Sequence, residues 1–274
     1  MLCRLAGVSR SGYYAFKKAC PERFKKDAQA LAIIKKYFIK SFEKAGIVTL
    51  DMLMRKDGFI INHKKIARIK REYGLITKIR RRNPYREIPL KSREHKIIPN
   101  ILRRDFNSLQ PDEIYSTDMT YLFYGKCEKA YLSATKDLAT NEIVSFNLMR
   151  TPTVSAFTQE FKKLIEKLPG HKKANLIIHS DQGFQYTHPD FIKLLHEHGV
   201  TQSMSRAGNC LDNAPIESFF GHFKDLIDLK SCRTIEDVEK EIKRKINYYN
   251  TERPQKALNK KPPAEYRGLL SSFF

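Results

Sequence analysis

The sequence predicts an α/β protein in which a small basic helical module precedes a mixed five-stranded sheet with helices. Three observations support this prediction. Apolar residues recur at helical spacing between residues 27 and 73, strand and helix patterns alternate from residue 112 onward, and positive charge is concentrated before residue 100. The chain has 274 residues, of which 41% are hydrophobic, so it can bury a core of this kind.

The charge is unevenly distributed along the chain. The net charge is +21, from 51 Lys and Arg against 30 Asp and Glu. Residues 1–100 hold 26 basic and 8 acidic side chains, whereas residues 101–274 are nearly neutral. A basic excess of this size indicates a polyanionic partner, and a nucleic acid fits better than a membrane surface.

Several other classes of protein are excluded. No apolar run approaches the roughly 20 residues that a membrane span needs, and the first residues lack the apolar core of a signal peptide. The five cysteines include no C-x-x-C pair, which argues against a disulfide framework and a structural zinc site. We therefore expect a cytoplasmic protein with no membrane partner.

The first residues are typical of the end of a helix-turn-helix. Residues 2–16 contain a tight turn around Gly7, a helix cap at Ser9 and then a short aromatic-rich helix. We assign residues 1–20 to a partial helix-turn-helix. An ordinary helical hairpin explains the same pattern equally well.

Residues 21–83 are predicted to form a basic helical DNA-binding domain. Helices are expected over 27–42, over 49–56, and from a cap at Asn62 to Gly74. The last helix and the segment after it are crowded with basic side chains, which suit contacts with DNA phosphates, although charge runs often form solvated faces. The predicted DNA-binding residues are Lys64, Lys65, Arg68, Arg71, Arg80, Arg81 and Arg82.

A proline-containing segment, residues 84–111, is predicted to be an extended linker before the α/β domain. The alternation that follows predicts both strands and helices. The expected strands are 114–124, 129–139, 142–149, 174–181 and 201–205, and the expected helices are 153–168, 189–198, 213–227 and 234–250.

Three carboxylates interrupt or end these predicted core elements. Asp118 lies inside the first strand, where its charge is costly to bury without a cation. Asp181 ends a buried strand at the edge where α/β sheets bind ligands, and Glu217 lies in the first turn of a helix. Each alone has a structural explanation, such as a turn cap. Together they predict an oxygen-rich site for two Mg²⁺ or Mn²⁺ ions, which suits phosphodiester chemistry.

Other polar and aromatic residues near these carboxylates have alternative interpretations. His179 shares a side of its strand with Asp181, and either contacts DNA, tunes the metal site or is buried against the sheet. The turn over 182–186 is a place where a substrate strand could pass. Asp212 is interpreted as a helix cap and Asp137 as structural. The phenylalanines of the helix carrying Glu217 are expected to pack onto the sheet; they are Phe219, Phe220 and Phe223.

Four segments carry a family resemblance. They read STDMTY (116–121), HSDQGFQY (179–186), SRAGNCLDNAPIESFFGHFK (205–224) and YYNTERPQKALNKKPPAEY (248–266). They are similar to the DDE-class insertion-sequence transposases, most closely to B-frame products with a retroviral-integrase-like catalytic core. That family has 35 residues between its second aspartate and its glutamate, as between Asp181 and Glu217 here. It also has a basic residue seven positions after the glutamate, which here is Lys224.

The resemblance implies an RNase H-like integrase core over residues 112–268, with a C-terminal helix. It implies that Asp118, Asp181 and Glu217 are catalytic residues that bind two Mg²⁺ or Mn²⁺ ions. Lys224 is expected to contact DNA near the scissile phosphate, and Arg206, on a loop that we interpret as mobile, is expected to bind DNA. The implied enzyme is a polynucleotidyl transferase that cleaves strands at element ends and transfers them, which is DNA transposition, integration and recombination.

The implied partners are double-stranded DNA, from terminal repeats and target, and further copies of the chain. An upstream A-frame protein is a further expected partner, because residue 1 opens inside the helix-turn-helix. The implied location is the bacterial cytoplasm, in association with the nucleoid. The alternative function is that of a truncated or inactive copy that acts as a DNA-binding regulator.

Overall fold

The computed structural model divides the chain into two compact units, residues 1–79 and 80–274. Each unit has a buried core of its own, and the two are described separately. The residues that the structure describes are 2–78, 98–108, 110–126, 128–206 and 210–272, without the side chains of 2, 19–26 and 210.

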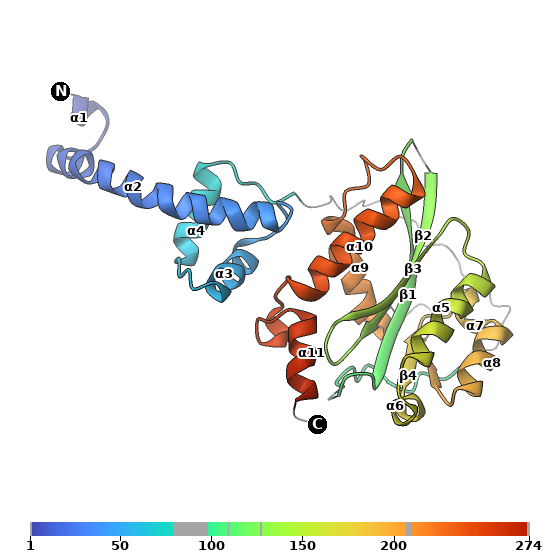
Figure 1. Ribbon diagram of the computed structural model, residues 1–274. Helices are drawn as coiled ribbons and strands as arrows, with labels where there is room; N and C mark the ends of the chain where they lie inside the picture. Colours follow the sequence, from blue (N-terminus) through green and yellow to red (C-terminus); the bar gives the residue numbers. More distant parts are fainter. Residues whose placement is uncertain (1, 79–97, 109, 127, 207–209, 273–274) are drawn as a thin grey trace. The chain divides into compact units, whose positions relative to one another are not determined.

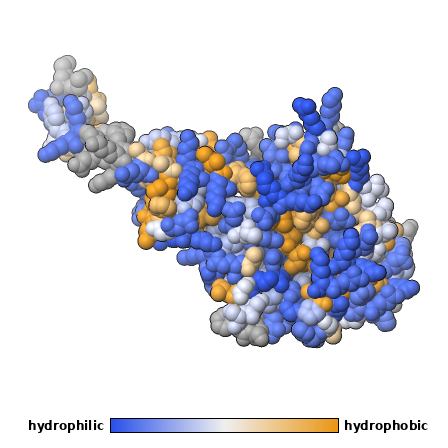
Figure 2. Space-filling view, in the orientation of Figure 1, coloured by the Kyte–Doolittle hydropathy of each residue, from blue (hydrophilic) through white to orange (hydrophobic). Residues whose placement is uncertain are grey.

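The surface of the protein is mainly hydrophilic on the face shown in Figure 2, with smaller apolar areas among the polar ones. In the described part of the chain, no helix combines the length and the apolar character that crossing a membrane requires. Both observations fit a chain in which 30% of the residues are charged.

The first unit is entirely helical in its described part (Figure 1). Its core contains apolar side chains from α2, α3 and α4, including the fully buried Ile34, Leu50 and Ile66. Its elements are α1 (Leu2–Leu5), α2 (Arg10–Lys40), α3 (Ile47–Lys56) and α4 (His63–Glu72).

The long helix α2 corrects the prediction of a separate short helix near the N-terminus. Ser9 caps α2 as expected, because its hydroxyl accepts a hydrogen bond from the backbone N–H of Gly12 at 3.0 Å. The helix then continues to Lys40. No glycine follows Gly12 within α2, and the helix continues even though Pro21 removes one backbone donor.

The predicted ends of α3 and α4 are confirmed. Gly58, with φ at +82°, follows the end of α3, and Gly74, with φ at +64°, follows the end of α4. Asn62 caps α4 by accepting a hydrogen bond from the backbone N–H of Lys64 at 2.8 Å. The helix ends at Glu72, two residues before Gly74, and the ring of Tyr73 after it is exposed.

The second unit contains the predicted mixed five-stranded sheet, in the order β3-β2-β1-β4-β5. The β1–β2 and β2–β3 pairs are antiparallel, whereas β1–β4 and β4–β5 are parallel. The strands are β1 (Ile114–Tyr124), β2 (Glu128–Asp137), β3 (Ile143–Met149), β4 (Ile177–Ser180) and β5 (Thr201–Met204).

Helices cover both faces of this sheet, which therefore has a separate apolar core on each side. On one face, α9 (Ala214–Leu226) and α10 (Ile235–Thr251) pack against β1, β2 and β3. On the other face lie α5 (Val154–Glu166), α7 (Phe184–Thr187) and α8 (Pro189–Glu197). The elements of this unit that the sequence did not predict are α7, α6 (Gly170–Asn175), α11 (Pro263–Ser271) and the 3₁₀ turns Cys210–Asn213 and Lys256–Leu258.

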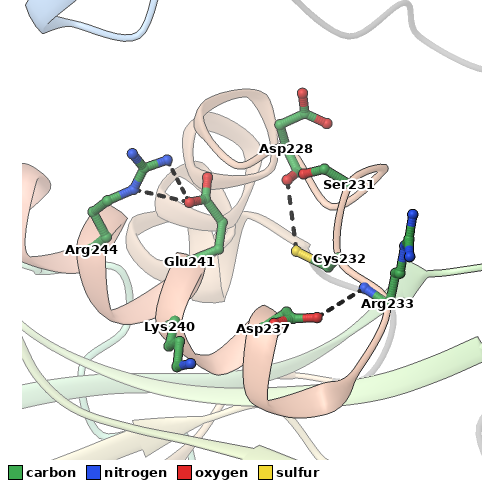
Figure 3. Close-up of a pocket in the computed structure, with 8 residues that line it drawn as sticks. All are labelled: Asp228, Ser231, Cys232, Arg233, Asp237, Lys240, Glu241 and Arg244. Atoms are coloured by element: carbon green, nitrogen blue, oxygen red, sulfur yellow. Dashed lines mark hydrogen bonds and ion pairs between the residues drawn. The ribbon is translucent and has the colours of Figure 1, made fainter.

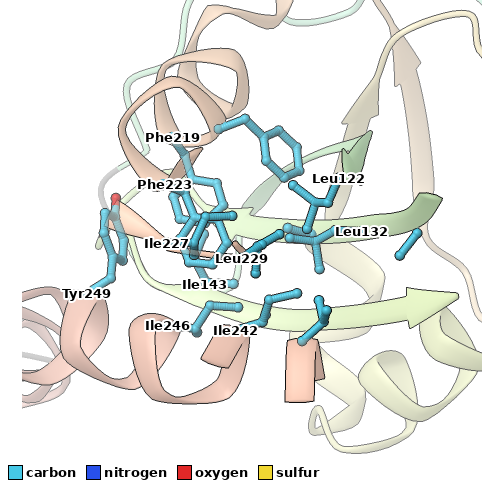
Figure 4. Close-up of a cluster of buried hydrophobic side chains, with 14 of the residues drawn as sticks. Leu122, Leu132, Ile143, Phe219, Phe223, Ile227, Leu229, Ile242, Ile246 and Tyr249 are labelled. Atoms are coloured by element: carbon cyan, nitrogen blue, oxygen red, sulfur yellow. The ribbon is translucent and has the colours of Figure 1, made fainter. Parts of the chain in front are cut away.

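The side of α9 that carries its phenylalanines packs onto the sheet, as predicted (Figure 4). The ring centroid of Phe219 lies 5.2 Å from that of Phe223 and 5.0 Å from that of Tyr249 in α10. Leu122 of β1 and Leu132 of β2 belong to the same buried cluster. This packing fixes α9 against the strand that carries Asp118.

Part of the predicted linker is built into the second unit. The backbone N–H of Ile101 donates to the Ser203 hydroxyl at 3.0 Å, and the side chain of Leu102 is buried. The amide of Asn100 donates to Asp212 at 3.0 Å. Residues 100–102 are therefore part of the folded unit rather than an open spacer, and residues 84–97 lie outside the described residues.

Candidate active site

The two predicted catalytic aspartates lie at matched positions on neighbouring strands. Ser116 of β1 pairs with His179 of β4 in parallel register. Asp118 and Asp181 each lie two residues further along the chain, Asp118 inside β1 and Asp181 just after β4 ends. Since adjacent strands are about 4.8 Å apart, this register places the two carboxyl groups at the same edge of the sheet.

The negative charges of both aspartates act on one buried tyrosine. Tyr186 of α7 is buried, and its hydroxyl lies 3.2 Å from the hydroxyl of Thr117. Its pKa is well above the ordinary range, because of burial and because Asp118 and Asp181 both act on it. Because the ring of Tyr186 is buried in the core, the turn over 182–186 can present only its other residues to solvent.

Each aspartate is oriented by a backbone hydrogen bond. Asp118 Oδ1 accepts from the N–H of Met119 at 2.7 Å, and Asp181 Oδ1 accepts from the N–H of Gly183 at 2.7 Å. A Cβ atom added to Gly183 would lie only 2.8 Å from that Asp181 oxygen. Asp181 thus forms a turn, which the sequence offered as its structural explanation, and Gly183 leaves space for its carboxylate.

The start of α9, the helix that carries Glu217, is bonded to the sheet just before Asp118. The Ser116 hydroxyl donates to Asn213 Oδ1 at 2.9 Å, and Asn213 Nδ2 donates to the carbonyl of Thr117 at 3.4 Å. From β2, Lys136 Nζ donates to the carbonyl of Pro215 at 3.2 Å.

The other end of α9 is bonded to the sheet just after Asp118. Lys224 Nζ donates to the hydroxyl of Thr120, and the same atom lies 5.4 Å from the centroid of the Tyr121 ring. Glu217 is exposed and lies seven residues before Lys224, on the same side of the helix. The helix is therefore fixed to β1 on both sides of Asp118, with Glu217 between the two attachments.

The structure does not bring all three carboxylates onto one centre. Within the described residues, which include Asp118, Asp181 and Glu217, no group of three or more His, Cys, Asp or Glu side chains is arranged to hold a metal ion. The two aspartates form a pair by strand register. Glu217 is held on a neighbouring helix.

Asp212 does not cap α9, contrary to the prediction. Its side chain is fully buried, and its carboxylate accepts hydrogen bonds from Arg206, Arg104 and Asn100. The hydrogen bonds from Arg206 are the main reason that its pKa lies far below the ordinary range. Three cationic or amide partners from outside the helix therefore take up the oxygens that a cap would use.

His179 is buried against the sheet, which decides among the three alternatives left by the sequence. Its Nδ1 lies 2.9 Å from the Ser203 hydroxyl, and its Nε2 lies 2.8 Å from the carbonyl of Asp212. Burial lowers its pKa, which favours the neutral imidazole. The ring holds β5 and the segment before α9 in place rather than facing a ligand.

Asp137 has a structural role, as predicted. It is fully buried and accepts a hydrogen bond from Arg267 of α11 at 2.8 Å and from the backbone N–H of Asp112 at 2.9 Å. Arg267 was not among the residues predicted from the sequence. Its signal in the sequence is a single charged residue in the segment 266–274, which is weak.

The DNA-binding residues predicted in the basic helical domain fall into three groups. Lys65 and Arg68 are bound to the buried Asp27 of α2, at 3.3 and 2.9 Å, so part of their charge holds α4 against α2. Lys64 and Arg71 are exposed. Arg80, Arg81 and Arg82 lie outside the described residues.

Lys136 is a further residue at this site that was not predicted from the sequence. It is buried in β2, and burial lowers its pKa to about 8. Its hydrogen bond to Pro215 fixes the start of α9, two residues before Glu217. A lysine directly after the apolar and small run 130–135 was the signal that could have found it.

A separate pocket of about 520 Å³ lies between α10 and the segment before it (Figure 3). Arg244 pairs with Glu241 at 2.6 Å, and Asp237 accepts a hydrogen bond from the backbone N–H of Arg233 at 3.1 Å. None of the three predicted catalytic carboxylates lines this pocket.

Comparison with known protein families is consistent with this architecture. A family model described as an integrase core domain matches residues 108–210, and a second model with the same description matches residues 198–263. A model described as an HTH-like domain matches residues 25–83.

Individual relatives extend over almost the whole chain. The chain is 42% identical to an uncharacterized transposase-like protein of Haemophilus influenzae over 210 residues, which are 76% of this chain and 93% of that protein. It is 33% identical to the putative transposase InsK for insertion sequence element IS150 of Escherichia coli over 271 residues, 97% of this chain and 92% of that protein.

Among solved structures, the HTLV-2 integrase catalytic core domain in complex with magnesium matches with 18% identity and a TM-score of 0.47, over 59% of this chain and 99% of that chain.

The family matches and the near full-length relatives show that the chain belongs to the insertion-sequence transposases that contain an integrase core domain. Its function is DNA transposition and integration, and its enzymatic class is that of the polynucleotidyl transferases. The HTH-like and integrase domains make it a DNA-binding protein.

Proposed function

We propose that Asp118, Asp181 and Glu217 are the catalytic residues of this transposase and that together they bind two Mg²⁺ or Mn²⁺ ions. The matched position of Asp118 and Asp181 on adjacent parallel strands is the observation that carries this proposal. Glu217 is supplied by α9, which is bonded to β1 on both sides of Asp118. Carboxylate oxygens are the ligands that these hard cations prefer.

The residues of the chain have separate tasks in this proposal. Two bound divalent ions supply the positive charge that activates an attacking hydroxyl and stabilises the leaving oxygen of a phosphodiester. Asp118 and Asp181, each oriented by a backbone N–H, provide two negative charges at one edge of the sheet. Glu217, exposed on α9 between the two attachments of that helix to β1, supplies the third carboxylate.

Basic residues position the DNA in this proposal. Lys224 lies beside Asp118 through its bond to Thr120, where it can contact a phosphate near the bond that is cut. Arg206 extends toward DNA from its attachment to Asp212, with 60% of its side chain exposed. In the first unit, the exposed Lys64 and Arg71 bind the phosphates of the terminal repeats, together with Arg80, Arg81 and Arg82.

The active form is a homo-oligomer on DNA, because strand transfer requires both ends of an element to be held together. An upstream A-frame protein is a further partner that this proposal includes. The reaction takes place where the DNA substrate is, in the bacterial cytoplasm at the nucleoid.

Cleavage and joining of labelled duplexes that carry the element ends test the catalytic assignment. Wild-type protein is expected to nick and join these duplexes with Mg²⁺ or Mn²⁺ and not in EDTA. Asp118→Asn, Asp181→Asn and Glu217→Gln are each expected to lower the rate by at least about a hundredfold, since each removes a negative charge from the metal site.

Glu166→Gln is the matched control, because Glu166 is an exposed carboxylate at the end of α5. It should cleave at the wild-type rate. All four variants should retain the thermal stability of the wild type and its affinity for the same duplex in EDTA. Cleavage that survives in Glu217→Gln, or that needs no divalent ion, would contradict the assignment. A wild-type protein that binds but never cuts would fit a DNA-binding regulator instead.

A further inference from the structure

One face of the β1–β2 hairpin carries exposed aromatic rings. Tyr121 and Phe123 of β1 are 42% and 60% exposed. Tyr121 pairs across the strands with Tyr131, and Phe123 pairs with Lys129. Alternate residues of a strand and directly paired residues share a face, so these four side chains form one surface, which we call the aromatic face.

The helices on this side of the sheet do not cover the aromatic face. The buried cluster under α5, α7 and α8 includes Tyr115 with Met119 packed against it, and among the described residues it includes no residue of β1 after Met119. Figure 1 shows the hairpin end of β1 and β2 extending beyond these three helices. Large apolar rings left uncovered in this way indicate an interaction surface.

The rings of the aromatic face are held in place, with positive charge beside them. The Phe123 and Tyr121 centroids are 5.4 Å apart, with an interplanar angle of 72°. Lys129 Nζ lies 4.7 Å from the centroid of Tyr121 and 5.1 Å from that of Tyr131. Phe123 therefore has the most exposed ring of this face, and its cross-strand partner Lys129 places a positive charge next to it.

The aromatic face is connected to the catalytic residues around one edge of the sheet. β4 pairs with β1 only over residues 114–116, so within the described residues the rest of β1 has no strand on that side. Lys224 lies at this edge, where Nζ bonds Thr120 on the Asp118 side and also approaches the Tyr121 ring. Phe123 lies five positions after Asp118 along the strand, a distance of about 17 Å at roughly 3.4 Å per residue.

We propose that the aromatic face binds unpaired bases of a DNA strand that passes the catalytic carboxylates, with Phe123 stacking on a base and Lys129 pairing with a phosphate. Aromatic rings stack on bases without regard to sequence, but only where the duplex is open, because paired bases already stack on each other. Lys129 and Lys224, whose ammonium groups lie beside these rings, favour a polyanion over a protein partner. The location rests on the proposed function, since the carboxylates define where the strand is cut.

Photochemical cross-linking tests this binding site independently of catalysis. A short oligothymidylate containing 5-iodouracil would be irradiated with the full-length protein in EDTA, and the cross-linked tryptic peptides would be identified by mass spectrometry. The expected cross-link is to the peptide 105–126, which contains Phe123. A duplex of the same length should compete poorly at this peptide, because its bases are not available for stacking.

Three variants separate stacking from other effects. Phe123→Leu keeps an apolar side chain but removes the ring, and should lower the cross-link yield at 105–126 by roughly 5- to 150-fold, the range for one stacked base. Phe123→Tyr keeps the ring and should behave as wild type. Leu269→Ala truncates another exposed apolar residue, in α11, and should have no effect.

Several outcomes would overturn the proposal: cross-links confined to residues 1–78, an unchanged yield in Phe123→Leu, or an equal loss in Leu269→Ala. A changed oligomeric mass in Phe123→Leu with normal cross-linking would assign the face to a protein contact instead. Glu217→Gln should retain the cross-link at 105–126. Loss of cleavage with an intact cross-link, or the reverse, therefore distinguishes failure of this proposal from failure of the catalytic assignment.

Discussion

Arg206 binds both carboxylate oxygens of the buried Asp212, through Nε at 2.8 Å and Nη2 at 3.0 Å. Arg104 adds a third charged hydrogen bond at 2.7 Å. The same carboxylate thus connects the segment before β1, the loop after β5 and the turn that leads into α9. Because α9 carries Glu217, the ionic cluster at Asp212 also determines where that helix begins.

Asp212→Asn should destabilise the second unit by about 1–3 kcal/mol, because two arginines lose a charged acceptor. The pKa of Asp212 is lowered in the folded state, so its stabilisation is present above the unfolded pKa of about 3.9 and is lost as the pH falls below it. Urea denaturation at pH 7 and at pH 3 should show a difference between variant and wild type that shrinks in acid. Asp190→Asn, at an exposed position, should change stability by no more than about 0.5 kcal/mol at either pH.

Arg267→Met should be strongly destabilising. Arg267 bonds Asp112 and Asp137 at 2.8 Å each and also pairs with Glu142, so it attaches α11 to the sheet. Its removal leaves the carboxylate of Asp137 buried without its cation, at a cost of about 3–5 kcal/mol.

Acid should partly rescue Arg267→Met. Burial already raises the pKa of Asp137, and Arg267 opposes that rise, so the variant's carboxyl takes up a proton more readily as the pH falls. The difference in unfolding free energy between variant and wild type should therefore be smaller at pH 5 than at pH 8. Lys261→Met removes a half-exposed partner of Glu265 and should cost no more than about 1 kcal/mol at both pH values.

Glu160→Gln should stabilise the protein at high pH. Glu160 of α5 is buried and bonded to the Ser145 hydroxyl at 3.0 Å, and burial raises its pKa to about 7. A raised carboxyl pKa means that stability is lost as the pH rises from the unfolded pKa, about 4.3, to the folded one, and stays low above it.

The glutamine variant cannot ionise, so at pH 8 it should unfold at a higher temperature than wild type, with a free energy of unfolding larger by up to about 3 kcal/mol. At pH 4 the two proteins should unfold at similar temperatures. Thermal denaturation followed by circular dichroism measures both. The exposed Glu166→Gln in the same helix should show no such pH-dependent gain; an equal gain there would exclude burial of Glu160 as the cause.

Gly183→Ala should lower DNA cleavage while leaving the fold intact. The new methyl group would lie 2.8 Å from Asp181 Oδ1 and would displace the carboxylate, since the side chain moves more easily than the backbone. We expect at least about a tenfold loss of cleavage rate, because small displacements of reacting groups are costly. Gly268→Ala meets no neighbour and should stabilise α11 by roughly 0.5–1 kcal/mol with unchanged cleavage. Full activity in Gly183→Ala would mean that the position of Asp181 does not matter.

Much of the fold could be predicted from local patterns. β1 and β3 occur where apolar alternation and flanking turn residues predicted them, and the caps at Ser9 and Asn62 are present. α7 and the 3₁₀ turns were missed because elements of three or four residues contain no helical period. The sequence predicted two shorter helices where the structure has the single helix α2. The turn signal before Arg10 did not indicate that one helix continues to Lys40.

The catalytic carboxylates could be nominated from the sequence, but their relation could not. The spacing between Asp181 and Glu217 is a property of the chain, whereas the match between Asp118 and Asp181 depends on the parallel register of β1 and β4. The partners of Asp212, at Arg104 and Arg206, and the pairing of Arg68 with Asp27 likewise join distant segments. No local pattern distinguishes a lysine or arginine that binds DNA from one that binds a buried carboxylate.

The sequence by itself determined that this chain has a basic helical front, a mixed α/β body and three acidic residues suited to hard cations. Those conclusions depend on charge, periodicity and spacing, which are written locally along the chain. Only the tertiary structure decided that two of the acids share an edge of the sheet, that His179 and Asp212 are structural, and that the rings of Tyr121 and Phe123 stay exposed. The physical reason is that strand register, burial and ion pairing are set by which distant segments pack together, and packing optimises the whole core rather than any one segment.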